Sequence, residues 1–527
     1  MVPGLISGAP LDSDTVSSVD VPDLIFALSP ELASVAAAKQ VIDQACQEAQ
    51  GLWERLGERS LLASTDHVDA KRFREQLKDV WDFSYAAVAM QGEEDFPRAR
   101  ARAMEILAAT ENTRCFGQSM GPPGLPKSSL DGRRDTVWNS VGPPAESSLG
   151  KRLRLSAGEH LDAVGLTKRI GKDTRAFPSV SRIAAEPWLA SLSEGDRQSL
   201  AAHCAAMVPH GLIQINKERY PAFGQFAYEA TVVYPSREKE IWEEEGPPNE
   251  VHRRLIAERD RLLAKYGEAS PYFAILAADG DNLTMALNQA GTVEAHRDFS
   301  VLLSKFTERC RKIVQQRFHG CVIYAGGDDL LALLPVTEAI ACAKELHEEF
   351  GAMMGGPTLS VAVVIGHHLE SLEDHVGRAF SALFNDAKKP DRDGLAIHYY
   401  PRGGASVSVR GQWRGGISDR LEQATAAYAG GAIPHRLAYE IQDLVLHYRD
   451  WDQTDALLAG AIGADLKRLL AKKELEEGKS EELLHGFGGA IRTVDELERL
   501  GRELLISQRL VQCHPQAGLR GQDDLKS

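Results

Sequence analysis

Residues 321–335 read Cys-Val-Ile-Tyr-Ala-Gly-Gly-Asp-Asp-Leu-Leu-Ala-Leu-Leu-Pro. The apolar runs on either side of Gly326-Gly327 predict two short buried strands joined by a tight turn, because glycine tolerates the positive φ of such turns. A plain hairpin does not need the two adjacent carboxylates, Asp328 and Asp329, that follow the turn. Acidic groups are costly to bring together unless a cation neutralises them. This stretch therefore predicts a hairpin built to bind a metal.

A second acidic strand end lies upstream. Residues 271–282 read Pro-Tyr-Phe-Ala-Ile-Leu-Ala-Ala-Asp-Gly-Asp-Asn, an apolar run of strand length that ends in two carboxylates. Two central strands that each deliver carboxylates at one end can hold two Mg²⁺ or Mn²⁺ ions through oxygen ligands. Taken singly, either motif could instead be a solvated loop or an ordinary turn. Together they predict Asp279, Asp328 and Asp329 as metal ligands and catalytic residues.

The segments around these motifs predict an α/β domain. A helical pattern runs from Asp281 to about Phe318 and is followed by the hairpin. Next come a helix at 337–350, a strand at 359–366, a helix at 372–388 and a strand at 395–400. Strands that alternate with amphipathic helices indicate helices packed on one sheet. The order β-α-β-β-α-β-α-β is that of a ferredoxin-like core, as in polymerase palms and nucleotidyl cyclases.

The flanking regions predict three further domains. Strands at 23–29 and 81–90, with helices at 31–56 and up to about 110, form a partial α/β unit. A Gly-, Pro- and Ser-rich loop at 117–142 opens a loop-rich helical region. The C-terminal part is helical from about residue 417, at 437–448, 454–477 and 493–510. The predicted domains are 1–113 (partial first palm-like), 114–265 (linking), 266–405 (acidic motifs) and 406–527 (helical).

Composition limits the classes of protein. The chain has 527 residues, 43% of them hydrophobic and 26% charged, which is ordinary for a soluble globular protein. It contains no run of 18 apolar residues and no basic N-terminal region, so we expect a cytoplasmic protein that is neither membrane-spanning nor secreted. A net charge of −15 argues against a protein that coats nucleic acid with its whole surface. Local basic segments could still meet RNA, or could be solvated surfaces; they are 98–102, 133–134 and 151–154.

The seven cysteines do not indicate a structural metal. None of them forms a Cys-x-x-Cys motif, so structural zinc is not expected. Single cysteines in apolar contexts are typical of buried packing in a reducing compartment.

Several motifs together resemble a known family. Those typical of a GGDEF/cyclase-type Palm are Asp-Gly-Asp-Asn at 279–282, Gly-Gly-Asp-Asp at 326–329, and Ala387-Lys388 with Arg392. With Ser360-Val361-Ala362 and His367-His368, the chain resembles the Palm-domain large subunit of type III CRISPR effector complexes, in particular its Cmr (III-B) branch. Upstream segments that share the resemblance are 112–114, 124–130, 158–169 and 177–179.

The resemblance implies an activity, a substrate and partners. It implies a nucleotidyltransferase that makes cyclic oligoadenylate from ATP when a target RNA pairs with a guide RNA held by other Cmr-type subunits. Mg²⁺ or Mn²⁺ on the three aspartates would activate a ribose 3′-hydroxyl for attack on an α-phosphate, releasing pyrophosphate. The residues that it assigns to the nucleotide are Gly280, Asp281, Asn282, Gly326, Gly327, Lys388 and Arg392.

The chain also departs from the family. No adjacent His-Asp pair occurs near the start, so we expect no HD nuclease domain and an incomplete first Palm. Asp391 and Asp393 replace the glycine and asparagine of the family's Gly-Arg-Asn turn. Lys388 and Arg392 could equally complement a helix dipole rather than contact phosphate. Asp281 could cap a helix or support its neighbours.

Two other functions stay open. A diguanylate cyclase would carry the same hairpin, although Leu330 stands where that signature has phenylalanine. A non-catalytic scaffold subunit is the second alternative, which the three clustered carboxylates disfavour.

Overall fold

Two compact units make up the chain. The computed structural model describes residues 4–5, 25–29, 32, 34–113, 122–130, 132–139, 142–153, 155–171, 177–210, 212–238, 249–455, 457–471 and 491–513. The first compact unit, here called the sheet unit, comprises Met1–Phe26, Phe177–Leu287 and Arg297–Ser527. The second, here called the helical unit, comprises Ala27–Ala176 and Asn288–His296. The four domains predicted from the sequence stay a prediction.

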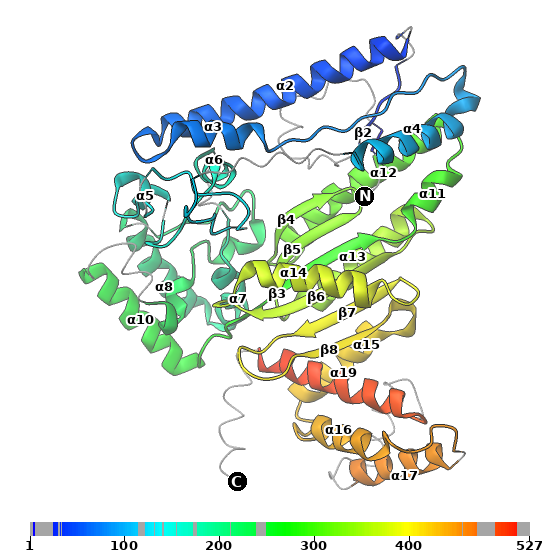
Figure 1. Cartoon of the computed structure of the whole chain (residues 1–527). Coiled ribbons are helices and arrows are strands. Elements are labelled where there is room, and N and C mark those ends of the chain that lie inside the picture. The colour runs from blue at the N-terminus through cyan, green and yellow to red at the C-terminus, as the bar shows by residue number, and fades with distance from the viewer. Residues whose placement is uncertain are drawn as a thin grey trace. The chain divides into compact units, whose positions relative to one another are not determined.

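A six-stranded sheet forms the centre of the sheet unit (Figure 1). Its strands are β3 (Tyr272–Gly280), β4 (Cys321–Gly326), β5 (Asp329–Pro335), β6 (Leu359–His367), β7 (Gly394–Tyr399) and β8 (Val407–Gln412). The order is β4-β5-β3-β6-β7-β8, and β6–β7 is the parallel pair while the other neighbours are antiparallel. The predicted mixed α/β fold with its β-hairpin is confirmed. Strand β8 was not predicted, because its sequence Val-Ser-Val-Arg-Gly-Gln carries only two apolar residues.

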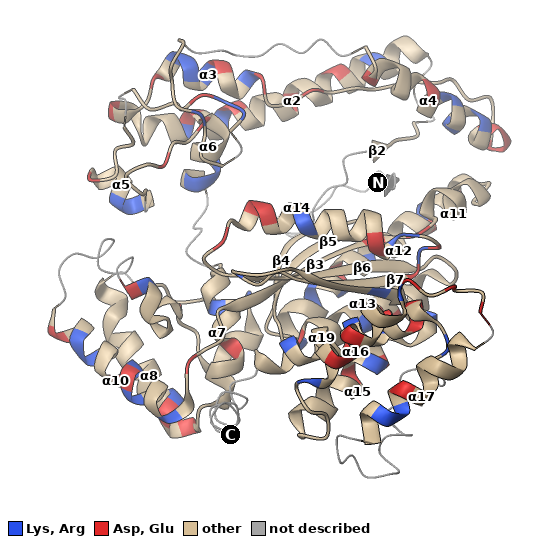
Figure 2. Ribbon diagram, turned by 60° about the horizontal axis from the view of Figure 1, so that its bottom comes forward, with Lys and Arg blue, Asp and Glu red and all other residues tan. Residues whose placement is uncertain are grey.

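Helices cover both faces of this sheet. Alternate residues of a strand point to opposite faces, and Ala274 and Leu276 of β3 pack with α12 (Val293–Lys312) and α13 (Ala339–Met354). The intervening residues pack with α7 (Val180–Ser191) and α14 (Leu372–Ala382). Figure 2 shows α13 and α14 on opposite sides of the strands. Burial on both faces explains why β3 is a continuous apolar run.

Two predicted helices are interrupted. The pattern from Asp281 to Phe318 divides into α11 (Leu283–Gln289) and α12, with Gly291 between them, and ends in a π-helical turn at Ile313–Arg317. Helix α14 likewise continues into a π-helical turn, η9 (Leu383–Ala387). Such turns add a residue to the helix and are frequent at functional sites. Here η9 ends immediately before Lys388.

The remaining helices of the sheet unit agree with the helical patterns in the sequence. They are α8 (Glu194–Met207), α10 (Glu250–Tyr266), α15 (Ile417–Ala429), α16 (Leu437–Tyr448), α17 (Leu458–Ala471) and α19 (Val494–Gln512). Arg420 of α15 donates hydrogen bonds to both carboxylate oxygens of Glu503 of α19, and Glu503 is buried. Part of the predicted helix 454–477 lies outside the described residues. Single 3₁₀ turns lie at 65–67, 93–95, 208–210, 221–225, 231–233, 235–237 and 413–415.

The helical unit has a small core of its own. Its helices are α2 (Val35–Leu62), α3 (Ala70–Lys78), α4 (Phe96–Glu111), α5 (Ser148–Leu153) and α6 (Ala163–Gly171). Phe73, Trp138 and Leu161 are buried between them. The strand predicted at 81–90 is wrong: this segment is irregular, and Tyr85 donates a hydrogen bond to Asp43 of α2. Its aromatic side chains pack on a helix instead of pairing with a neighbouring strand.

The strand predicted at 23–29 is confirmed only at β2 (Ile25–Phe26), which pairs in parallel with β1 (Gly4–Leu5). The predicted loop 117–142 is described at 122–130, 132–139 and 142, where it forms turns and isolated bridges rather than a helix or strand. Its other residues, Arg154 and Cys115 lie outside the described residues. Of the described cysteines, five are buried: Cys204, Cys310, Cys321, Cys342 and Cys513. Among the described helices, none is both long and apolar enough to cross a membrane.

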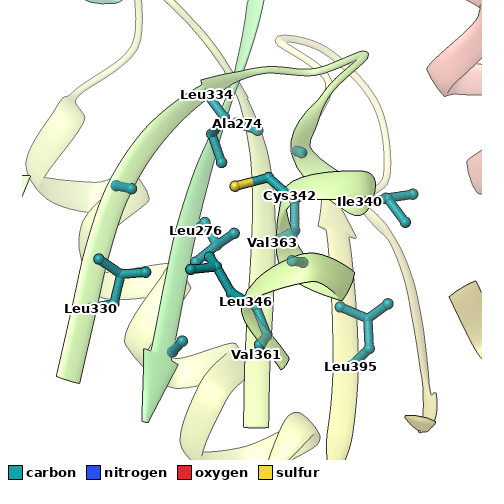
Figure 3. Close-up of a cluster of buried hydrophobic side chains, with 14 of the residues drawn as sticks. Ala274, Leu276, Leu330, Leu334, Ile340, Cys342, Leu346, Val361, Val363 and Leu395 are labelled. Atoms are coloured by element: carbon teal, nitrogen blue, oxygen red, sulfur yellow. The ribbon is translucent and has the colours of Figure 1, made fainter. Parts of the chain in front are cut away.

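The core under the hairpin should dominate the stability of the sheet unit. Leu276 is fully buried among the side chains in Figure 3, so Leu276→Ala should lower the free energy of unfolding by about 2–5 kcal/mol through a cavity. The control is Ile323→Ala on β4, whose side chain is 46% exposed and should cost far less. Urea unfolding followed by circular dichroism measures both. Equal losses would contradict this assignment of the core.

Candidate functional site

The strand register brings the two acidic motifs together. The last paired residues of β3 and β5 are Ala278 and Leu330, so Asp279 is the next residue along β3 and lies beside Asp329. Within the hairpin, Asp329 pairs with Gly326. Gly327 turns the chain with a φ of 64°, a conformation that favours glycine. The strand register and the turn therefore place the carboxylates at one end of the sheet, as the sequence predicts.

Gly280 allows the closest approach in this group. A Cβ atom at Gly280 would lie 2.9 Å from the Cβ of Asp328 and 2.6 Å from Cδ1 of Leu283. Real Cβ atoms do not approach this closely, so any larger residue would push the hairpin away. The glycine between the two aspartates of β3 thus sets how near the hairpin carboxylates lie to the strand end.

The hairpin carboxylates are poorly neutralised. Asp328 is 4% exposed, and its Oδ1 atom has no hydrogen-bond partner. Burial, and then the neighbouring carboxylate of Asp279, raise the pKa of Asp328 to about 7 and that of Asp329 to about 6. A buried carboxylate that lacks partners is costly. Such an arrangement favours a bound cation or a shared proton.

One cation of the chain itself reaches the acidic group. The Lys388 Nζ lies 2.5 Å from Oδ1 of Asp279, donates a hydrogen bond to the Gly280 carbonyl at 3.1 Å, and lies 3.6 Å from Oδ1 of Asp281. Lys388 follows η9, and its amide donates to the Leu383 carbonyl at 3.0 Å. The lysine therefore belongs to the acidic site rather than to a solvated helix end.

Asp281 has a different role from its neighbours. It is fully buried, and its carboxylate accepts hydrogen bonds from Thr358 Oγ1 at 2.9 Å, from Ser360 Oγ at 2.8 Å and from the Asp393 amide at 3.0 Å. With its oxygens occupied, Asp281 ties β3 to β6 and to the turn before β7. Sequence reasoning left this role open and did not single out Thr358, because its partners are far away along the chain.

The other predicted nucleotide residues lie at the margin of the site. Asn282 is exposed and has a φ of 60°, and its carbonyl accepts the first hydrogen bond of α11. Arg392 is exposed with a φ of 61°, and within the described residues its guanidinium makes no ion pair with the aspartates. His367 and His368 lie at the far end of β6, where burial lowers the pKa of both and that of His368 to about 3.

The donor set fits a divalent cation in its chemistry. It offers carboxylate oxygens of the kind that Mg²⁺ and Mn²⁺ prefer, and a buried oxygen of Asp328 without a partner. Within the described ranges, however, no three His, Cys, Asp or Glu side chains stand in a metal-holding arrangement. The Asp279 carboxylate instead accepts a hydrogen bond from the Lys388 ammonium. The three aspartates as ligands therefore stay a prediction.

Comparison with known proteins identifies this part of the chain. Residues 272–396 match the family model described as Cas10/Cmr2, second palm domain. These residues are similar to the second palm domain of Cas10/Cmr2 proteins. The resemblance stated from the sequence is confirmed, and the match runs from β3 to β7, so it includes the hairpin, Asp281 and Lys388.

A curated relative and two solved structures agree with it. The CRISPR system Cmr subunit Cmr2 of Pyrococcus furiosus is 31% identical over 182 residues, which is 28% of this chain and 21% of that protein. The apo state of a type III-B Cmr-beta complex contains a chain similar in fold, with a TM-score of 0.54 at 11% identity over 92% of this chain and 69% of the other. For Cmr-beta bound to cognate target RNA the TM-score is 0.50 at 13% identity, over 80% and 61%.

The raised carboxyl pKa values of the palm domain predict a pH effect. The pKa of an aspartate in the unfolded chain is about 4. In the folded chain the pKa values of Asp328 and Asp329 are about 7 and about 6. Between these pH values the folded chain therefore keeps protons that the unfolded chain has released. This contribution to stability is complete below about pH 4 and is lost as the pH rises through the folded values. The variant with Asp328→Asn and Asp329→Asn cannot titrate. Relative to the wild type it should gain about 1–3 kcal/mol between about pH 5 and pH 8 without divalent cations.

Urea unfolding at several pH values with a chelator measures this difference. The control is Asp391→Asn, which removes an exposed carboxylate of the turn after Lys388 and should leave the profile parallel to the wild type. Parallel profiles for the double variant as well would show that the two carboxyls are not perturbed.

Proposed function

We propose that this chain is a nucleotidyltransferase that joins ATP molecules into cyclic oligoadenylate. The observation that carries the proposal is the meeting of Asp279, Asp328 and Asp329 at one end of the sheet with the ammonium of Lys388 among them. Uncompensated carboxylates are hard to explain as structural groups, since buried charges are normally paired. A triphosphate with its divalent cations supplies the charge that this site lacks.

Each group of the chain has a definite task in this reaction. The three aspartates would hold the divalent cations that bind the two ATP molecules, so that a ribose 3′-hydroxyl can attack an α-phosphate and pyrophosphate can leave. Lys388 neutralises phosphate charge, and Asp281 keeps it within reach by fixing the strand end and the turn before β7. Gly326 and Gly327 let the nucleotide lie against the backbone. Bound Mg²⁺ or Mn²⁺ would lower the pKa of the attacking hydroxyl and stabilise charge on the leaving group.

We further infer that the chain works in the cytoplasm as the large subunit of a type III CRISPR effector complex. The second palm domain and the Cmr2 relative support this, and the fold is shared with a chain of a complex bound to cognate target RNA. Guide and target RNA would be held mainly by other Cmr-type subunits, because the net charge of this chain is −15. Their pairing would switch on synthesis.

A silent scaffold subunit is the second candidate. The observation that favours it is the ion pair of Lys388 with Asp279, which partly neutralises the acidic group without any ligand. A scaffold would assemble with its partners and make no nucleotide product. A diguanylate cyclase would instead consume GTP without RNA.

Removal of the hairpin carboxylates should abolish synthesis. Asp328→Ala together with Asp329→Ala should reduce nucleotide product by at least about a thousandfold, because metal-dependent phosphoryl transfer loses its charge stabilisation. The complex, with its guide RNA, is incubated with labelled ATP or GTP, Mg²⁺ or Mn²⁺, and target RNA. Mass spectrometry identifies the products, and size-exclusion chromatography reports assembly.

The matched control replaces two acidic residues outside the site, Asp391 and Glu373, both exposed. It should keep full activity. Turnover of ATP at the wild-type rate by the Asp328/Asp329 variant would refute the assignment, and an inactive wild-type complex that assembles normally would favour the scaffold.

A further inference from the structure

We propose that Lys388 acts as a built-in counter-ion of Asp279 that a divalent cation displaces, and that the displaced ammonium then binds the triphosphate. This inference deepens the proposed function and rests on it. Lys388 would thus have two successive partners. Its ammonium pairs with Asp279 when no metal is bound, and it binds the phosphates of the substrate when a metal is bound.

The contacts of Lys388 place it where a cation would be expected. Its ammonium lies 2.5 Å from Oδ1 of Asp279 and donates to the Gly280 carbonyl at 3.1 Å. Both the Lys388 and the Asp279 side chains are largely buried, at 14% and 15% exposure. An ammonium and a divalent cation on the same carboxylate repel each other and compete for its negative charge. Binding of a cation by Asp279 therefore weakens the contact between the Lys388 ammonium and Oδ1 of Asp279.

Asp281 does not need Lys388 in the same way. Its oxygens already accept hydrogen bonds from Thr358, Ser360 and the Asp393 amide, and the Lys388 ammonium is 3.6 Å from its Oδ1. Loss of the lysine from Asp279 would thus leave the buried hydrogen bonds of Asp281 intact. The part of the Lys388 environment that can change is the contact with Asp279.

Charge balance favours the exchange. Lys388 supplies one positive charge to three aspartates that lie within mutual electrostatic reach, and Asp328 Oδ1 has no hydrogen-bond partner. A divalent cation brings twice the charge, and the Asp328 and Asp329 carboxylates can add to its ligands. The long flexible stem of lysine lets the ammonium move by several ångströms while its backbone stays fixed. The released ammonium would then be able to pair with the phosphates that accompany the cation.

The exchange predicts effects of opposite sign in one variant. Lys388→Met in the full chain should bind Mn²⁺ about tenfold more tightly without nucleotide, because Asp279 loses its competing ion pair. With Mn²⁺ present, the same variant should bind a non-reactive α,β-methylene analogue of ATP about tenfold more weakly, because a charged phosphate contact is missing. Isothermal titration calorimetry measures both affinities, and thermal unfolding checks that the variant folds.

The matched control is Lys389→Met, which removes the same charge from the next residue. Lys389 is exposed, and within the described residues its Nζ contacts Asn385, at 3.5 Å from Oδ1. Both affinities should therefore stay within about twofold of the wild type. A second comparison uses Asp279→Asn, in which Lys388→Met should no longer tighten Mn²⁺ binding. This cycle remains informative even where Lys388→Met lowers stability, since it compares two chains that both lack the ion pair.

The outcomes separate this inference from the proposed function. Weaker binding of both Mn²⁺ and the analogue would make Lys388 a structural residue and overturn the exchange. Unchanged Mn²⁺ affinity in Lys388→Met, with a wild type that binds Mn²⁺ and makes product, would overturn the exchange alone. A wild-type chain that binds no Mn²⁺ would overturn the exchange and the proposed catalytic site together.

Discussion

The antiparallel pairing of β3 with β5 is the interaction on which the site depends. Side chains alternate between faces along a strand, so a slip of one residue would turn Asp279 away and reverse every core residue of β3. Alternate positions of β3 pack into two separate helical layers, and such a slip would unpack both. The register is thus held by apolar burial far larger than any electrostatic term at the strand end. The core imposes the proximity of the carboxylates, which would separate if they were free.

Asp281 and Asp328, which lie at the same end of the sheet, are both buried but have opposite environments. Asp281 is buried but fully hydrogen-bonded, which removes most of the cost of its burial. Asp328, packed against Gly280, is buried with an unpartnered oxygen, a cost of about 1–3 kcal/mol. The hydrogen bonds of Asp281 make the end of the strand rigid. The unpartnered carboxylate of Asp328 is stabilised when a cation binds. A site that binds a cation needs both, because a loose frame could not hold unneutralised groups at a fixed separation.

The sequence predicts those features that depend on local pattern. The strands buried on both faces are visible as apolar runs, and the Gly-Gly turn with its two aspartates marks the hairpin. Strand β8 could not be recognised in the sequence, since an edge strand needs few apolar residues. Residues 81–90 have the composition of a strand but pair with no strand in the described part of the chain. The roles of Thr358 and Asp281 depend on partners about 80 and 110 residues apart. Periodicity carries no information about such pairs.

The turn that carries Lys388 shows how tertiary contacts can replace a missing sequence signal. Arg392 and Asp393 have φ values of 61° and 51°, a conformation that costs a residue other than glycine about 1 kcal/mol. The Asp393 amide donates to Asp281, and the Asp393 carbonyl accepts a hydrogen bond from the Trp413 amide at 2.9 Å. These bonds use only the backbone of Asp393, so the turn does not require the family's asparagine side chain. The buried carboxylate of Asp281 therefore fixes the turn after Lys388 through a backbone amide, whichever side chain stands at position 393.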